Sequence, residues 1–366
     1  MSPATAVRSE GATGILSAAL ELKASDVHLS AGQPPLARVD GGLLELSGWP
    51  SLTEEDCKSL VYSLLREEQR ARLEAELELD CSLTISGIGR FRANVFFQRG
   101  RVEAALRAVP AVIPTPETLG LGPATMGLSD LPRGLVLVTG PAGAGKTTTL
   151  ACMVERINAS ASKHILTIED PIEFLYPRRR ALIRQREVGS DTRSFQEALR
   201  RALREDPDVI LVGEMRDAET IALALTAAET GHLCLSTLHT VDSAQSIDRI
   251  IDVFPERQQA QVRGQLAAVL KGVLAQMLLP RRGGAGRIAA RELLLVNSAV
   301  ANLIREGKTH MLRQTIETSG ALGMFTLDRS LAALVQRGAV TMEDALARAQ
   351  DPDRLSAACG RGASRL

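Results

Sequence analysis

The residues that most clearly indicate a chemical function lie at positions 140–147, which read G-P-A-G-A-G-K-T. An apolar run, residues 135–139, precedes them, and a helix-like stretch, residues 148–157, follows. A buried strand, a glycine-rich turn and a Lys-Thr pair that opens a helix form the arrangement that binds nucleoside triphosphates. The N–H groups of the turn surround the phosphates, and the helix N-terminus adds positive potential. The pattern therefore predicts binding of ATP or GTP.

Two side chains of this loop have distinct expected roles. Lys146 is expected to reach the β- and γ-phosphates, and the Thr147 hydroxyl is expected to hold Mg²⁺. An ordinary glycine-rich turn is the alternative, but it does not account for strand, motif and helix in register. The residues expected to bind the nucleotide are Gly140, Pro141, Ala142, Gly143, Ala144, Gly145, Lys146, Thr147 and Thr148.

Glu214 follows a second apolar run, residues 209–212, with Gly213 between them. Many phosphate-loop ATPases carry Asp and then Glu here, where Asp supports Mg²⁺ and Glu polarises the attacking water. Because Gly213 occupies the first of these positions, Glu214 is the candidate general base and the usual metal-side Asp is missing. The alternative for Glu214 is a surface carboxylate at a strand end.

Glu169 and Asp170 end a third apolar run, residues 165–168. In a parallel sheet the carboxyl ends of the strands gather at one edge, where ligands bind, so both carboxylates are expected near the phosphates. Glu169 is favoured for the Mg²⁺ shell, directly or through water, over a purely structural role.

The histidines and arginines are harder to assign. His239 follows the apolar run at residues 233–237 and is expected to sense the γ-phosphate, whereas His232, before that run, is favoured less. Four arginines (Arg90, Arg92, Arg99 and Arg107) lie on or beside predicted strands near the N-terminus. They form either a solvated strand face or a set that reaches a nucleotide across a domain or subunit contact, as arginine fingers do.

Composition narrows the function classes. The chain has 366 residues, 45% of them hydrophobic, and 43 basic against 43 acidic residues, so its formal net charge is zero. A large electrostatic surface for nucleic acid is therefore not expected, which argues against a nucleic-acid translocase. No apolar stretch approaches the roughly 20 residues of a membrane span, and residues 1–19 do not resemble a signal peptide. Five widely spaced cysteines suggest reduced thiols in the cytosol.

Two domains are predicted, with a boundary near residue 112. Upstream, a hairpin at residues 36–46, a helix at residues 53–78 and three antiparallel strands within residues 81–109 make a small α+β domain. Clustered prolines and glycines predict an extended linker over residues 110–130. Downstream, apolar runs alternate with helical patterns, as in a parallel sheet. Residues 295–350 are expected to be helical, and residues 351–366 to be disordered.

Several segments together resemble the secretion and pilus ATPase superfamily, in particular the type IV pilus retraction ATPases. Besides the phosphate loop, the matching segments are A-S-D-V-H-L-S-A-G from residue 24, G-R-F-R-A-N-V-F from residue 89, T-I-E-D-P-I-E-F from residue 167, A-L-R-E-D-P-D-V-I-L-V-G-E-M-R-D from residue 202 and S-T-L-H-T from residue 236. The resemblance extends from about residue 20 to about residue 350.

This resemblance implies a PAS-like α+β N-terminal domain, residues 1–112, and a RecA-like α/β ATPase domain, residues 113–366, assembled as a homo-hexamer. ATP binding and release would rotate one domain against the other. Glu214 matches the catalytic glutamate, with glycine before it as the family has, and His239 lies in the family's histidine box. Arg92 and Arg107 match phosphate-contacting arginines. ATP and Mg²⁺ are the implied ligands.

The implied function is a cytoplasmic motor that retracts type IV pili for twitching motility. It would act on an inner-membrane platform protein, beside a paralogous pilus ATPase, with no direct nucleic-acid partner. Residues 299–306 resemble the Ala-Ile-Arg-Asn-Leu-Ile-Arg-Glu signature associated with retraction, differing at Val300 and Ala301. The alternatives are a pilus assembly or type II secretion motor, which typically carries a four-cysteine zinc module, and a regulatory ring subunit with little turnover.

Overall fold

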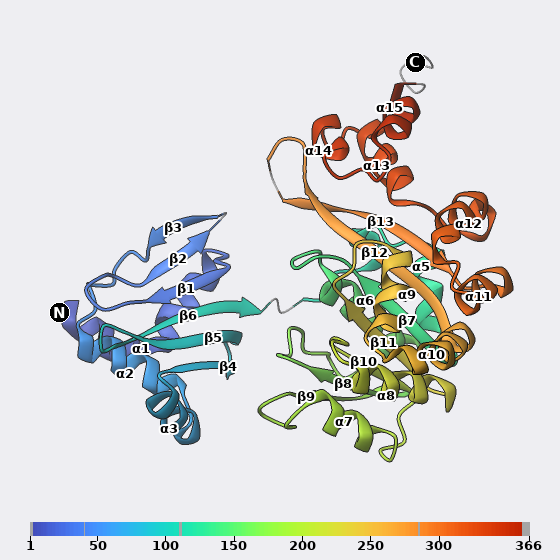
Figure 1. Ribbon diagram of the computed structural model, residues 1–366. Helices are drawn as coiled ribbons and strands as arrows, with labels where there is room; N and C mark the ends of the chain where they lie inside the picture. Colours follow the sequence, from blue (N-terminus) through green and yellow to red (C-terminus); the bar gives the residue numbers. More distant parts are fainter. Residues whose placement is uncertain (1–2, 40, 110–111, 285, 361–366) are drawn as a thin grey trace. The chain divides into compact units, whose positions relative to one another are not determined.

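The computed structural model describes residues 3–39, 41–109, 112–284 and 286–360. It divides into two compact units, each with its own sheet (Figure 1). The first comprises Met1–Val112 with Pro171–Leu175, and the second comprises Ile113–Asp170 with Tyr176–Leu366.

The first unit is a six-stranded antiparallel sheet with helices on one face. Its strands lie in the order β3-β2-β1-β6-β5-β4. Along β5, the buried Phe91, Ala93 and Val95 alternate with exposed polar residues. This period of two directs the apolar side chains to the helices and leaves the other face polar. The elements are α1 (Pro3–Glu21), β1 (Asp26–Leu29), β2 (Leu36–Val39), β3 (Gly42–Glu45), α2 (Glu54–Leu64), α3 (Glu67–Glu76), β4 (Glu78–Ile85), β5 (Gly89–Gln98) and β6 (Arg101–Val109).

The single helix predicted over residues 53–78 is wrong, because the structure contains two helices there. Leu65 has extended backbone angles, φ −96° and ψ 143°, and ends α2. The chain starts a new helix at once, since the Arg66 N–H donates to Gln69 Oε1 at 2.9 Å. Leu77, with φ 65°, then turns the chain into β4. These local breaks are invisible in the spacing of Glu, Arg and Leu.

The second unit contains a seven-stranded sheet in the order β13-β12-β7-β11-β10-β8-β9. All neighbouring strands run parallel except β13, which pairs antiparallel with β12. The predicted apolar runs form β7, β8, β10 and β11, and the predicted α/β class is confirmed. The strands are β7 (Gly134–Thr139), β8 (His164–Glu169), β9 (Leu182–Glu187), β10 (Val209–Val212), β11 (Leu233–Leu238), β12 (Leu270–Pro280) and β13 (Arg287–Leu295).

Helices cover both faces of this sheet. In β7, Leu135 and Leu137 pack in one core cluster, while Val136 and Val138 pack in another. A strand buried on both faces is apolar throughout, which explains the uninterrupted run before the phosphate loop. The first face is covered by α7 (Phe195–Ala202), α8 (Ala218–Glu229), α9 (Ser243–Asp252) and α10 (Glu256–Val269), and the second by α6 (Lys146–Ser160).

The stretch predicted as an extended linker is helical over much of its length. It contains α4 (Pro116–Leu119), α5 (Pro123–Met126) and a 3-10 turn, η1 (Gly127–Asp130). Each α-helix begins with a proline, whose fixed φ suits the first helical position. Met126 and Leu128 are buried in the core beneath α6. Pro110 and Ala111 lie outside the described residues.

After β13 the described chain is helical, as predicted. The elements are α11 (Ser298–Arg305), η2 (Thr309–Met311), α12 (Leu312–Thr318), η3 (Gly320–Leu322), α13 (Leu327–Gln336), α14 (Met342–Leu346) and α15 (Pro352–Gly360). Helix α15 contradicts the disorder predicted from residue 351, since Leu355 is buried in a core shared with α13. Residues 361–366 lie outside the described residues. Throughout the described ranges, no helix is long and apolar enough to cross a bilayer.

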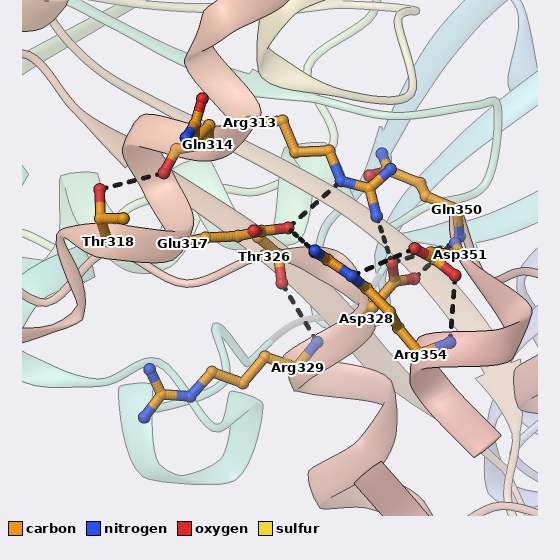
Figure 2. A network of polar contacts seen from close by, with 10 residues as sticks. All are labelled: Arg313, Gln314, Glu317, Thr318, Thr326, Asp328, Arg329, Gln350, Asp351 and Arg354. Atoms are coloured by element: carbon orange, nitrogen blue, oxygen red, sulfur yellow. Dashed lines mark hydrogen bonds and ion pairs between the residues drawn. The ribbon is translucent and has the colours of Figure 1, made fainter. Parts of the chain in front are cut away.

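Asp328, at the start of α13, holds three segments of the C-terminal region together (Figure 2). Its carboxylate accepts hydrogen bonds from the backbone N–H groups of Gln350 at 2.8 Å and Asp351 at 3.1 Å. It also accepts a hydrogen bond from Arg313 Nη2 of α12 at 2.9 Å. Because Asp328 is only 8% exposed, these bonds replace most of its hydration.

Substitution of Asp328 by Ala is expected to lower the free energy of unfolding by about 3 kcal/mol, because two N–H groups and a guanidinium lose their acceptor. Urea denaturation of the full chain measures this difference. Asp353→Ala, the same change at an exposed carboxylate of α15, should cost less than about 0.5 kcal/mol. Equal effects at the two positions would contradict the role given to Asp328.

Candidate functional site

The carboxyl ends of four neighbouring strands define the site. Strand β7 pairs with β11 up to Thr139 and Leu238, β11 pairs with β10 up to Ser236 and Val212, and β10 pairs with β8 up to Val212 and Ile168. Since these strands are parallel and in register, the segments that follow them all leave the sheet along the edge formed by the carboxyl ends of the strands. The structure thus brings the phosphate loop, His239, Glu214 and Glu169 to a common edge.

The loop after β7 has the backbone that its glycines predict. Gly140, Gly143 and Gly145 have φ values of 144°, 74° and 83°, which side chains disfavour. Gly145 is the N-cap of α6, so the first-turn N–H groups of that helix lack helical acceptors and are available to an anion. Lys146 Nζ lies over the loop and donates to the Gly140 carbonyl at 2.8 Å and the Pro141 carbonyl at 3.0 Å.

The neighbouring side chains suit a phosphate bound there. Thr147 and Thr148 occupy the first turn of α6 and are half-buried, whereas Pro141 and Ala142 are exposed. The loop N–H groups and the Lys146 ammonium can donate hydrogen bonds to phosphate oxygens, and the Thr147 hydroxyl oxygen can coordinate an associated Mg²⁺. The residues present therefore fit both ATP and Mg²⁺.

The side chains of an arginine and a histidine contact the carboxylate of Glu214. Its carboxylate lies 2.7 Å from Arg216 Nε and 3.5 Å from His239 Nε2. The Glu214 side chain is 18% exposed, while Arg216 and His239 are largely exposed. Glu214 and His239, predicted separately, thus lie together. Arg216 was missed as part of the site, although it stands two residues after Glu214 in the quoted segment.

The glycine before Glu214 has a steric reason. The Gly213 N–H donates to the Ile168 carbonyl at 2.8 Å, so the two strand ends are close. A Cβ at position 213 would lie 3.2 Å from that carbonyl oxygen and 3.5 Å from Glu169 Cα. Position 213 is therefore a tight site for any side chain, in keeping with the glycine found where other phosphate-loop ATPases carry Asp.

Glu169 is more enclosed than the sequence suggested. It is 5% exposed, and its Oε1 accepts hydrogen bonds from Thr167 Oγ1 at 2.6 Å and Gln185 Nε2 at 3.2 Å. Tyr176 lies nearby: burial raises its pKa well above the ordinary value, and the negative charge of Glu169 raises it further. Glu169 thus places an enclosed, hydrogen-bonded carboxyl group at the end of β8.

His232 lies at the amino end of β11, at the end of the sheet opposite the phosphate loop. It precedes β11, whose six residues span roughly 20 Å, whereas His239 follows it. His232 Nδ1 lies 2.9 Å from the Ala227 carbonyl and 3.2 Å from Thr230 Oγ1, at the end of α8. These contacts describe a local structural histidine, and the structure does not bring it to the phosphate loop.

Arg92 and Arg107 belong to the first unit and face each other across neighbouring strands. They are direct partners in the β5–β6 ladder, so their side chains share one face of that sheet. Arg107 Nε donates to Asp26 Oδ1 at 2.9 Å. Burial alone would raise the pKa of Asp26, but hydrogen bonds from Ser25 and Arg107 bring it below its ordinary value. Both arginines are exposed to solvent.

Comparison with known proteins identifies the family. Residues 125–284 match the family of type II/IV secretion system proteins. The type IV pilus retraction ATPase PilT of Pseudomonas aeruginosa is 49% identical over 341 residues, which cover 93% of this chain and 98% of that protein. The chain belongs to the type IV pilus retraction ATPase family. It is an ATPase, as its phosphate loop predicted.

Two further comparisons give the same result. A twitching motility protein of Neisseria gonorrhoeae is 44% identical, with coverage of 92% of this chain and 91% of the relative. The crystal structure of the pilus retraction motor PilT with bound ADP has a TM-score of 0.88 and 50% identity, covering 94% of this chain and 98% of that one. The similarity to the retraction ATPases therefore includes both units.

Glu214→Gln is expected to lower ATP turnover at least on the order of 100-fold, because the amide cannot accept a proton from water. Nucleotide affinity should remain, since the phosphate loop is unchanged. Steady-state hydrolysis and calorimetric ADP titration measure the two quantities. Glu219→Gln, on the exposed first turn of α8, is the matched control and should retain wild-type turnover. Wild-type turnover by Glu214→Gln would assign the base to another residue.

Proposed function

We propose that this chain is the ATP-driven motor that retracts and disassembles type IV pili for twitching motility. The end-to-end similarity to the retraction ATPase of P. aeruginosa is the observation that carries the proposal. The site supports active turnover rather than a purely regulatory subunit, because Lys146, Thr147 and Glu214 are all present at one edge of the sheet.

In this proposal, the phosphate loop binds the triphosphate of ATP. Its N–H groups and those of the first turn of α6 donate to phosphate oxygens. Lys146 Nζ exchanges the carbonyls of Gly140 and Pro141 for the β- and γ-phosphates. The ammonium is already within the loop, so little rearrangement of the lysine is needed.

Thr147 and Glu169 are the residues proposed to support Mg²⁺, Thr147 through its hydroxyl and Glu169 through water. Mg²⁺ would neutralise charge on the β- and γ-phosphates. A water-mediated role suits Glu169, because its Oε1 is already occupied by Thr167 and Gln185. Gly213, and not a carboxylate, directly precedes Glu214.

Glu214 is the proposed general base. Its carboxylate orients the attacking water and accepts its proton. Arg216 and His239 contact this carboxylate and would hold it in place until the water binds. His239, which is largely exposed, is the residue proposed to respond to the γ-phosphate.

Arg92 and Arg107 are proposed to neutralise phosphate charge on a nucleotide bound by another copy of the chain. Their placement side by side on the exposed sheet face supports this, since a single phosphate could contact both guanidinium groups. Such a role requires an oligomer, and we propose a homo-hexamer. Arg107 would then release Asp26.

The proposed partners are an inner-membrane platform protein of the pilus machinery and, in some assemblies, a paralogous pilus ATPase. The proposed location is cytoplasmic, peripheral at the inner membrane through that machinery. The exposed face of α11 is one surface available to a partner: Asn302 Nδ2 donates to Glu306 Oε1 at 2.8 Å, while Val300 and Ile304 pack in the core.

Arg92→Ala and Arg107→Ala are each expected to reduce the turnover of the assembled protein about tenfold or more, because transition-state charge loses a partner. ADP affinity should fall much less than turnover, because ADP lacks the γ-phosphate that is transferred. Arg72→Ala, which removes an exposed arginine on α3, is the control and should be neutral. Unchanged turnover in both strand variants would make these arginines a solvated face.

Cells that lack this gene are expected to carry excess surface pili and to lose twitching. Complementation with the wild-type gene should restore both properties, whereas Glu214→Gln should restore neither. Electron-microscopic pilus counts and stab-agar motility measure the outcome. Bald cells would indicate an assembly motor, and an unchanged count would indicate secretion or an accessory role.

A further inference from the structure

Gln276 lies buried beneath the phosphate loop, in the strand beside β7. It belongs to β12, which pairs parallel with β7 so that Ala275 stands opposite Thr139, the last residue before the loop. Gln276 is only 3% exposed. A glutamine so deeply buried requires partners for both ends of its amide, because an unpaired buried amide is costly.

Both ends of the amide are paired with the loop and its helix. Gln276 Nε2 donates to the Ala144 carbonyl at 2.6 Å. Its Oε1 accepts a hydrogen bond from Thr149 Oγ1, in α6, at 2.9 Å. One side chain therefore connects β12 to the end of the loop and to the helix that follows it.

The hydrogen bond to Ala144 determines the direction of a neighbouring N–H group. A peptide unit is planar and trans, so its C=O and its N–H point in opposite directions. When Gln276 holds the Ala144 carbonyl toward β12, the N–H of Gly145 is directed away from β12. That N–H belongs to the residue that caps α6, among the donors expected to face phosphate.

The backbone of the loop also rests closely on Gln276. A Cβ at Gly140 would lie 2.1 Å from the Gln276 carbonyl oxygen, and a Cβ at Gly145 would lie 3.3 Å from Gln276 Nε2. Both ends of the loop, at Gly140 and at Gly145, thus lie against Gln276. Its glycines allow the approach, and the Gln276 side chain gives the contact a specific orientation.

We propose that Gln276 is a positioning residue of the phosphate loop: its side chain orients the Ala144–Gly145 peptide for phosphate before nucleotide binds. Gln276 itself does not contact the nucleotide. The inference rests on the proposed nucleotide site at this loop. It predicts that loss of the amide donor weakens nucleotide binding even when the fold is retained.

Gln276→Met tests this in the full-length protein, because methionine keeps the length of the side chain and removes both hydrogen bonds. ADP affinity, measured by calorimetry, is expected to fall about tenfold, the upper range for one oriented hydrogen bond. The KM for ATP should rise as well. Leu274→Ala, on the same strand and fully buried but without a bond to the loop, is the control. It should lower the melting temperature yet keep ADP affinity within about twofold.

Wild-type ADP affinity in Gln276→Met would overturn the proposal, as would an equal loss of affinity in Leu274→Ala. If Gln276→Met does not fold, Gln276→Leu, another apolar side chain of similar volume, also lacks the donor to Ala144. The same loss of affinity is expected, and wild-type affinity would again overturn the proposal. Lys146→Ala distinguishes failure of the proposed nucleotide site from failure of the role of Gln276. If Lys146→Ala binds ADP normally, the assignment of the phosphate-loop site is wrong. If only Lys146→Ala loses affinity, the role of Gln276 alone fails.

Discussion

The parallel register of β7, β11, β10 and β8 is the constraint on which the site depends. It places segments that are far apart in the chain at one edge of the sheet, each at the end of a buried strand. A shift by one residue would turn the core side chains of a strand toward the opposite face, where different helices pack. The apolar packing on both faces therefore determines where Lys146, Glu214 and His239 lie, although none of them belongs to the core.

Strand β12 extends this constraint to the C-terminal helices. Near its middle, Gln276 contacts the phosphate loop, and three residues later Leu279 is buried in the core formed by α13, α14 and α15. Asp328 then connects α12, α13 and the start of α15 by hydrogen bonds. The loop and the C-terminal helices are thus built on a single strand, so a change in the position of β12 affects both.

The sequence predicts the phosphate loop, the strands beside it and, separately, Glu214 and His239 at the carboxyl ends of their strands, because glycine spacing and apolar runs are local signals. The contact between Glu214 and His239 is seen only in the structure. The break at Leu65 and the helices at Pro116 and Pro123 were missed, since they depend on capping and on burial against distant residues. Strand β9 is polar after its first two residues, so no long apolar run marks it, and it lies at the edge of the sheet beside β8. Gln276 could not be assigned from the sequence, because its partners lie more than 120 positions away and only the fold brings them together.

The close approach of Gly140 to Gln276 has a genetic consequence. The atom that a side chain at position 140 would meet is the backbone carbonyl oxygen of residue 276, which all amino acids possess. No replacement at position 276 can remove that oxygen, so a defect caused by a larger residue at 140 has no suppressor there. Compensation would require displacement of β12 itself. Suppressors of such a defect are therefore expected at residues that set the position of β12, and not at position 276.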